Sequence, residues 1–287
     1  MIQIISIVFS LAAILLFLYL IFIALRSDFR FSKRIFHDKA TMIVYWILRV
    51  LILFPALRAI QTQNYENILL CVMSLVLFVM PSVVEKRFKI EFPTVMECII
   101  LCFIFAHEIL GEIGAFYVTV PWWDTMLHTL SGFLLAAIGF SLFEVLNNTE
   151  KVKMKLSPFY LALVAFCFSM TVGVLWEFVE YSADHVLHLD MQKDTIVQTI
   201  DSVALDETKS NIVIHYDSID HTVFYTDNGE MIEIEGGYLD LGINDTMKDL
   251  FVCFIGAATF STFGYFNIKY EKEHSFTALF VPRKKED

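Results

Sequence analysis

The chain has 287 residues, of which 57% are hydrophobic, and its formal net charge is −11 at pH 7. Because soluble domains are typically about 45–50% apolar, this composition excludes an ordinary soluble globular protein. Acidic residues are concentrated between positions 184 and 245, which contain fourteen Asp or Glu and only two Lys. This excess of negative charge argues against nucleic acid as a partner of the segment. Every cysteine falls inside an apolar run without CxxC spacing, which predicts small buried side chains rather than metal or redox ligands (Cys71, Cys98, Cys102, Cys167 and Cys253).

Apolar runs of about 20 residues recur along the chain, and that length spans a bilayer core of ~30 Å. The first run begins directly after the initial methionine, without a basic region or a small-residue cleavage site, and so is predicted to be a retained helix. We predict seven spans: 2–25, 41–60, 67–84, 94–116, 124–146, 157–181 and 245–265.

The basic residues predict an orientation for these spans. Sixteen of the 21 Lys and Arg fall in alternate connections and in the C-terminal tail: Arg26, Arg30, Lys33, Arg34, Lys39, Lys86, Arg87, Lys89, Lys151, Lys153, Lys155, Lys269, Lys272, Arg283, Lys284 and Lys285. Since positive charge collects on the cytoplasmic side, the N-terminus is predicted outside and the C-terminus inside.

One sizeable polar segment interrupts the helical pattern. Alternating residues over 212–216, 221–225 and 231–234, with the turn signal Asp227-Asn228-Gly229, predict a small antiparallel sheet between spans six and seven. The predicted organisation is therefore an all-α integral membrane protein: spans one to six over 1–183, an acidic extracytoplasmic β subdomain over 184–244, span seven over 245–268 and a cytoplasmic tail over 269–287.

A short motif occurs twice. Asp124-Thr125-Met126-Leu127-His128 opens span five, and Asp245-Thr246-Met247-Lys248-Asp249 opens span seven. In each copy an Asp and a second ionisable residue lie four positions apart, which places both side chains on one helix face. Span six ends with Glu177 and Glu180, so the predicted orientation brings all these groups to the outer end of the helices.

Such a cluster predicts a metal site. At an effective dielectric of ~20, two like charges 4 Å apart repel by about 4 kcal/mol, so clustered carboxylates need protons, arginines or a cation. The candidate ligands are Asp124, His128, Glu177, Glu180, Asp245 and Asp249, with His128 or Glu180 as a general base, and the donor set suits Zn²⁺, Mn²⁺, Mg²⁺ or Fe²⁺. The alternatives are that the two aspartates only cap helices and that the group is a structural hydrogen-bonded network.

The remaining ionisable residues within the spans supply candidate substrate contacts. Arg49 and Arg58 lie in span two and would hold an anionic head group, while His107, Glu108 and Glu112 end span four. Trp122 is also a substrate-binding candidate, although Trp122 and Trp123 are most simply an interfacial aromatic anchor.

The later spans resemble the YjdF-type multi-pass bacterial inner-membrane proteins. The run Asp124-Thr125 … His128 … Ser131-Gly132-Phe133, the run Trp176-Glu177 … Glu180 and the run Asp245-Thr246-Met247 … Asp249-Leu250 carry this resemblance over roughly residues 94–268. It implies a multi-pass protein of the bacterial plasma membrane and no particular reaction.

Two classes of function follow from these patterns. The first is a metal-dependent hydrolase or transferase that acts on a lipid or lipid-linked substrate at the outer leaflet. The second is a non-enzymatic transporter, sensor or assembly factor, in which the polar cluster is structural and the acidic β segment meets a protein partner. The inner halves of the last three spans are nearly free of charge, which disfavours a transport path through the midplane.

Overall fold

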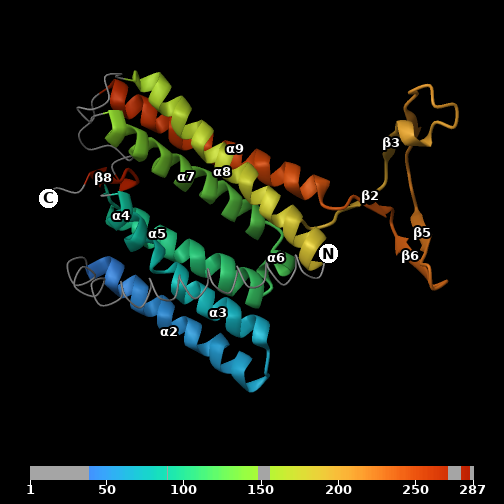
Figure 1. Ribbon diagram of the computed structural model, residues 1–287, viewed down its shortest axis with the longest axis horizontal. Coiled ribbons are helices and arrows are strands. Elements are labelled where there is room, and N and C mark those ends of the chain that lie inside the picture. The colour runs from blue at the N-terminus through green and yellow to red at the C-terminus, as the bar shows by residue number, and fades with distance from the viewer. Residues whose placement is uncertain (1–38, 89, 148–155, 271–278, 285–287) are drawn as a thin grey trace, which may run out of the picture. The chain divides into compact units, whose positions relative to one another are not determined.

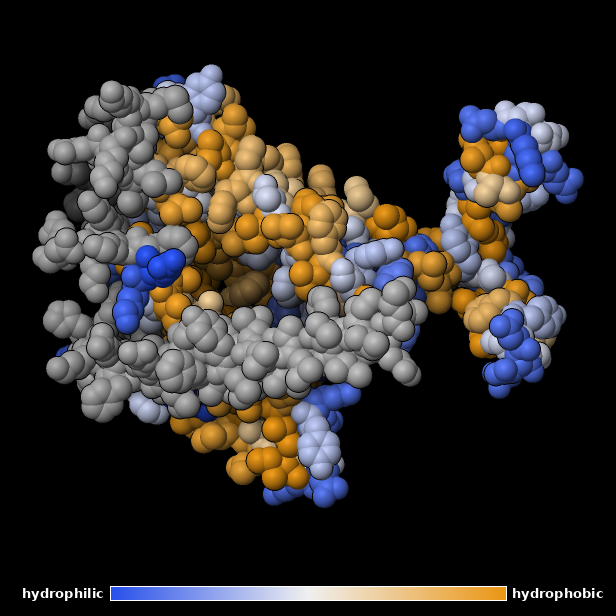
Figure 2. All heavy atoms as spheres, viewed as in Figure 1, coloured by the Kyte–Doolittle hydropathy of each residue, from blue (hydrophilic) through white to orange (hydrophobic). Residues whose placement is uncertain are grey.

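The computed structural model describes residues 39–88, 90–147, 156–270 and 279–284 (Figure 1). Within these residues, six helical segments are long and apolar enough to cross a membrane: Lys39–Gln61, Tyr65–Arg87, Thr94–Ile113, Trp123–Glu144, Pro158–Val186 and Ile243–Lys269. They correspond to predicted spans two to seven, while predicted span one (2–25) lies outside the described residues. Apolar side chains cover most of the visible helix surface in Figure 2, as expected for helices that face lipid.

The helices differ from the expected spans in two places. The second described segment is divided into α3 (Tyr65–Leu77) and α4 (Met80–Phe88). The third begins as α5 (Thr94–Phe105) and continues as the π-helical segment η1 (Ala106–Ile113), followed by the short α6 (Phe116–Thr119). The other helices are α2 (Lys39–Gln61), α7 (Trp123–Asn147), α8 (Pro158–Leu187) and α9 (Ile243–Lys269). π-Helical segments are rare in proteins, and those that occur are often found at functional sites.

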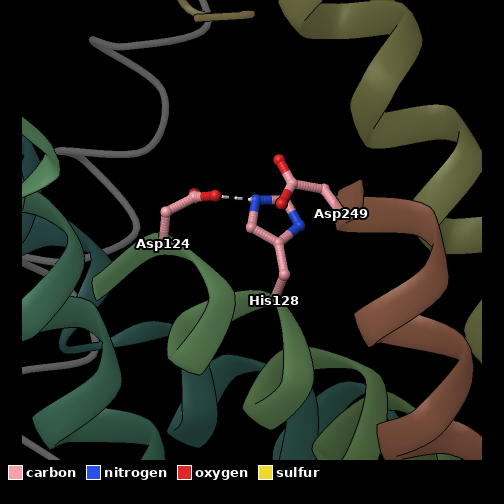
Figure 3. Close-up of side chains that lie close together, drawn as sticks. All are labelled: Asp124, His128 and Asp249. Atoms are coloured by element: carbon pink, nitrogen blue, oxygen red, sulfur yellow. Dashed lines mark ion pairs between the residues drawn. The ribbon is translucent and has the colours of Figure 1, made fainter. Parts of the chain in front are cut away.

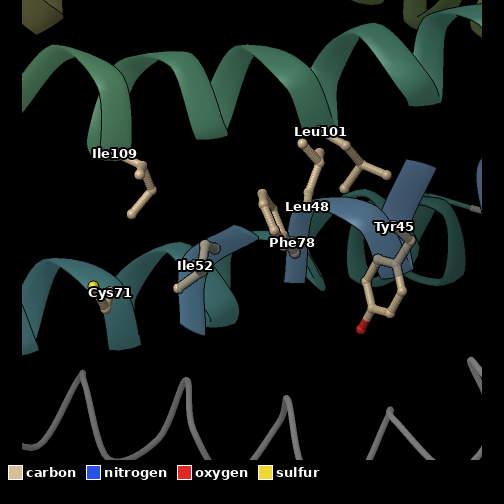
Figure 4. Close-up of a cluster of buried hydrophobic side chains, with 7 residues drawn as sticks. All are labelled: Tyr45, Leu48, Ile52, Cys71, Phe78, Leu101 and Ile109. Carbon is tan, nitrogen blue, oxygen red and sulfur yellow. The ribbon is translucent and has the colours of Figure 1, made fainter. Parts of the chain in front are cut away.

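The chain divides into two compact units, one formed by Met1–Ser169 with Ile255–Asp287 and the other by Met170–Phe254. In the first unit, α2, α3, α5 and η1 enclose an apolar core (Figure 4). The buried side chains of this core are Tyr45, Leu48, Ile52, Cys71, Phe78, Leu101 and Ile109. Ile109 of η1 belongs to this core, so the core packing supports the π-helical segment.

Helix α9 packs along α7 within the first unit. A Cβ atom on Gly256 would collide with the backbone carbonyl of Thr129, so glycine is required for this close approach. Further along, the Phe260 ring lies 5.1 Å from the ring of Phe133 and 6.0 Å from that of Phe140. Because the contacts advance in the same direction on both helices, α7 and α9 are parallel.

A short strand pair ties the C-terminal tail to the connection that precedes α5. Strand β1 (Ile90–Glu91) pairs antiparallel with β8 (Arg283–Lys284). Nearby, the backbone N–H of Phe92 donates to the buried carboxylate of Glu85 over 2.7 Å. Phe280 is buried, and its ring lies 5.1 Å from that of Phe133. The tail and this connection are therefore joined by backbone pairing.

The second unit contains three separate antiparallel strand pairs where the sequence predicts one small sheet. Strand β2 (Ile196–Val197) pairs with β7 (Tyr238–Leu239), β3 (Ile200–Ser202) with β4 (Ile214–Tyr216), and β5 (His221–Tyr225) with β6 (Met231–Glu235). The predicted turn is confirmed, since Gly229 has a φ of +79° and its N–H donates to the carbonyl of Thr226. Polar and apolar side chains are interspersed over these strands (Figure 2).

Candidate metal site

Helix α7 brings the first two candidate ligands together. Asp124 lies in the first turn, and His128 lies one turn further on the same face, as their spacing predicts. The Nε2 atom of His128 lies 3.4 Å from Oδ1 of Asp124, and both side chains are partly buried. An edge of a tetrahedron around an ion with 2.1 Å ligand bonds is about 3.4 Å long, so this pair fits one edge of a zinc-like site.

Asp249 of α9 completes a group of three. Ligand atoms of Asp124, His128 and Asp249 lie within 4.8 Å of one another, and Figure 3 shows the side chains converging from α7 and α9. Asp249 is almost fully buried, with 2% of its surface exposed. Its position follows from the parallel packing, because Asp249 lies about two turns before Gly256 on one continuous helix.

Glu177 lies at the level of Asp249 on the antiparallel helix α8. A Cβ atom on Gly173 would lie 3.1 Å from Sγ of Cys253, so α8 and α9 are closely packed there. Glu177 lies one turn after Gly173 on α8, and Asp249 lies one turn before Cys253 on α9. Both side chains are buried, at 4% and 2% exposure.

Glu180 and His107 each contact side chains that lie near them in the sequence. Oε1 of Glu180 accepts a hydrogen bond of 2.8 Å from the indole N–H of Trp176. In η1, Nδ1 of His107 lies 3.7 Å from Oε1 of the buried Glu108, and the His107 ring meets the Tyr117 ring edge-on at 5.7 Å.

Asp245, the remaining predicted ligand, is engaged in local contacts. Its Oδ2 accepts the backbone N–H of Lys193 over 2.9 Å, and its Oδ1 lies 2.8 Å from Nζ of Lys248. Asp245 is not part of the three-residue group, although it lies one turn before Asp249 as predicted.

The predicted substrate contacts fall in different surroundings. The Arg49 guanidinium lies 4.3 Å from the Tyr45 ring centroid in a cation–π arrangement, and Arg58 is exposed in the last turn of α2. Trp122 is 59% exposed, whereas Glu108 is buried and Glu112 is exposed. None of these five residues belongs to the three-residue group found in the part of the chain that the structure describes.

One cation that contacts the three-residue group was not singled out by the sequence patterns. Nζ of Lys248 lies 3.6 Å from Oδ1 of Asp249. The signal was present in the motif, because Lys248 occupies the position that Leu127 fills in the first copy.

Comparison with known proteins supports the membrane class of the chain. Residues 42–270 match the family described as "Predicted membrane protein (DUF2238)", and the chain belongs to this family. A relative from Thermotoga maritima, described as an uncharacterized protein, is 26% identical over 152 residues, which cover 52% of this chain and 73% of the relative. No solved structure matches the chain. The family is compatible with the YjdF-type resemblance and bears out its coarser content, a multi-pass membrane protein.

Proposed function

We propose that this protein binds a divalent metal ion through Asp124, His128 and Asp249 and uses it to hydrolyse or transfer a lipid or lipid-linked group at the outer leaflet. The observation that carries the proposal is the convergence of two carboxylates and one imidazole from α7 and α9. Three protein ligands leave a coordination position open, which is the arrangement of catalytic rather than structural zinc sites.

The donor set narrows the metal. An imidazole nitrogen beside two carboxylates suits Zn²⁺, Mn²⁺ or Fe²⁺ better than Mg²⁺ or Ca²⁺, which prefer oxygen ligands. When bound, such an ion would polarise an ester or phosphoryl oxygen and lower the pKa of a bound water. Glu180, which accepts a hydrogen bond from Trp176, is the candidate general base.

The test is the metal content of the detergent-purified protein, measured by elemental mass spectrometry. We expect about one divalent ion per chain in the wild type and at least about a tenfold loss in both His128→Gln and Asp249→Asn. Asp190→Asn is the matched control, because Asp190 is an exposed acidic residue outside the group and should leave the content unchanged. Absence of an ion from the wild type, or full retention in both ligand variants, would contradict the proposal.

A second candidate function has its own observation. The β5–β6 hairpin exposes large apolar side chains, including Phe224 at 44%, Tyr225 at 73% and Met231 at 60%. Exposed apolar surface on a short two-stranded pair is typical of a partner-binding segment. In this alternative the protein is a sensor or assembly factor, and deleting residues 221–235 would abolish its activity in cells without changing its metal content.

A further inference from the structure

The first turn of α9 holds a cation against one of the candidate ligands. The ammonium of Lys248 lies 2.8 Å from Oδ1 of Asp245 and 3.6 Å from Oδ1 of Asp249. Consecutive residues on a helix do not face each other, so the contact between Lys248 and Asp249 depends on the length of the lysine side chain. Asp245, three residues earlier, is well placed to hold it there.

The burial of the two partners is unequal. Asp249 is 2% exposed, whereas the side chain of Lys248 is 44% exposed. A buried carboxylate needs a compensating positive charge, while a half-exposed lysine can turn into water at little cost. The ammonium is therefore the partner that can leave.

A divalent ion at Asp249 would meet the same ammonium. Because metal–oxygen bonds are about 2.1 Å long, an ion on this carboxylate would lie only a few ångströms from Nζ of Lys248, and like charges at that distance repel strongly. The first copy of the motif carries no such conflict, since the buried apolar Leu127 stands at the equivalent position beside His128.

We propose that Lys248 is a built-in counter-cation that neutralises Asp249 when no metal is bound and must release it when a metal binds. The inference rests on the metal site proposed above and adds its regulation: the lysine weakens the site, so that the ion is exchangeable and not permanently held. Asp245 is a positioning residue in this device, because it keeps the ammonium beside Asp249 without being part of the ligand group.

The experiment is a titration of the metal-stripped, full-length protein in detergent with Mn²⁺, followed by electron paramagnetic resonance of the free ion. Lys248→Met keeps the aliphatic stem and removes the charge, and we expect it to bind Mn²⁺ about tenfold more tightly than the wild type at low salt. Lys248→Arg keeps the charge and should bind like the wild type. Raising the salt concentration should narrow the difference between Lys248→Met and the wild type.

Lys193→Met is the matched control, because Lys193 pairs with the exposed Asp190 and not with Asp249, and it should leave the affinity unchanged. Equal or weaker Mn²⁺ binding by a folded Lys248→Met protein would overturn the role of Lys248 and leave the metal site standing. Absence of Mn²⁺ binding by the wild type and by every variant would overturn the metal site itself, and this inference with it.

Discussion

Individual acidic residues of this chain divide into two groups by what they contact. Asp184 accepts the backbone N–H groups of Met191 and Gln192, and Asp206 accepts those of Thr208, Ser210 and Ile212. These carboxylates organise loops. Asp124 and Asp249 instead lie close to the imidazole of His128. The contacts of each carboxylate therefore distinguish those that hold loops from those that are candidate metal ligands.

Asp240 belongs to the loop-forming group, and it stabilises the start of α9. Its carboxylate accepts the N–H groups of Thr195, Gly242 and Asn244 at 2.8–3.2 Å. We expect Asp240→Ala to lower the stability of the second unit by about 1 kcal/mol, as for loss of a helix cap. Asp240→Asn, which keeps an acceptor oxygen, should cost less. The measurement is thermal unfolding in detergent, and Asp217→Ala, an exposed site, should show no shift.

The same carboxylate predicts a pH dependence. Burial by itself raises the pKa of Asp240, but hydrogen bonds from Thr195, Asn244 and Gly242 outweigh it and leave the pKa below its ordinary value. Because the pKa of Asp240 is lower in the folded state, its ionised carboxylate contributes to folding stability at pH values above the unfolded-state pKa of about 3.9. This contribution is lost as the pH falls through the folded-state pKa. The stability difference between wild type and Asp240→Ala should therefore shrink below about pH 4. A difference that stays constant into strong acid would contradict this assignment.

At the scale of elements, the parallel packing of α7 and α9 positions the candidate metal ligands. The two helices approach closely at Gly256, and the aromatic contacts of Phe133 and Phe140 with Phe260 set their register. Changes at these packing residues should therefore act on the site from a distance.

Gly256→Ala tests this packing. The added Cβ would meet the backbone oxygen of Thr129 and the backbone nitrogen of Phe133, which cannot turn aside as a side chain can. We expect a loss of about 1–3 kcal/mol of stability together with lower metal occupancy, because the helices must separate. Unfolding in detergent and metal analysis are the measurements. Thr259→Val, on the exposed side of the same helix, should change neither, and an unaltered Gly256→Ala protein would refute the close approach.

At the scale of the whole molecule, the membrane topology remains a prediction from the basic residues. Four candidate spans separate the connection before α5 from the C-terminal tail, so the predicted topology puts both on the same side of the membrane. The pairing of β1 with β8 agrees with this prediction, because it joins these two segments. The segment between α8 and α9 then lies on the opposite side. Its acidic residues suit the outer face, where positive charge is not enriched.

Cysteine accessibility in intact cells tests the topology. In a protein whose five native cysteines are replaced by alanine, Ser210→Cys should react with a membrane-impermeant maleimide added outside. Lys285→Cys should react only after permeabilisation. The reverse pattern would invert the predicted orientation, and external labelling of both would require a different number of spans.

Much of the architecture was predictable from hydrophobic patterning alone. The positions of six membrane helices, the β5–β6 hairpin with its Asn-Gly turn and the Asp124–His128 pair all follow from local periodicity and spacing. These features depend on residues close in sequence, whose geometry the backbone constrains. Predicted span one, at residues 2–25, stays a prediction because it lies outside the described residues.

By itself, the sequence determined that this is a multi-pass membrane protein with ionisable groups near the helix ends, because run length and charge placement are local properties. Only the tertiary structure decided which of those groups meet. The predicted topology already makes spans five and seven run in the same direction, but it cannot specify that they pack against each other, since this depends on where a glycine allows close approach. That packing brings Asp249 to Asp124 and His128, while Asp245 remains occupied by Lys193 and Lys248.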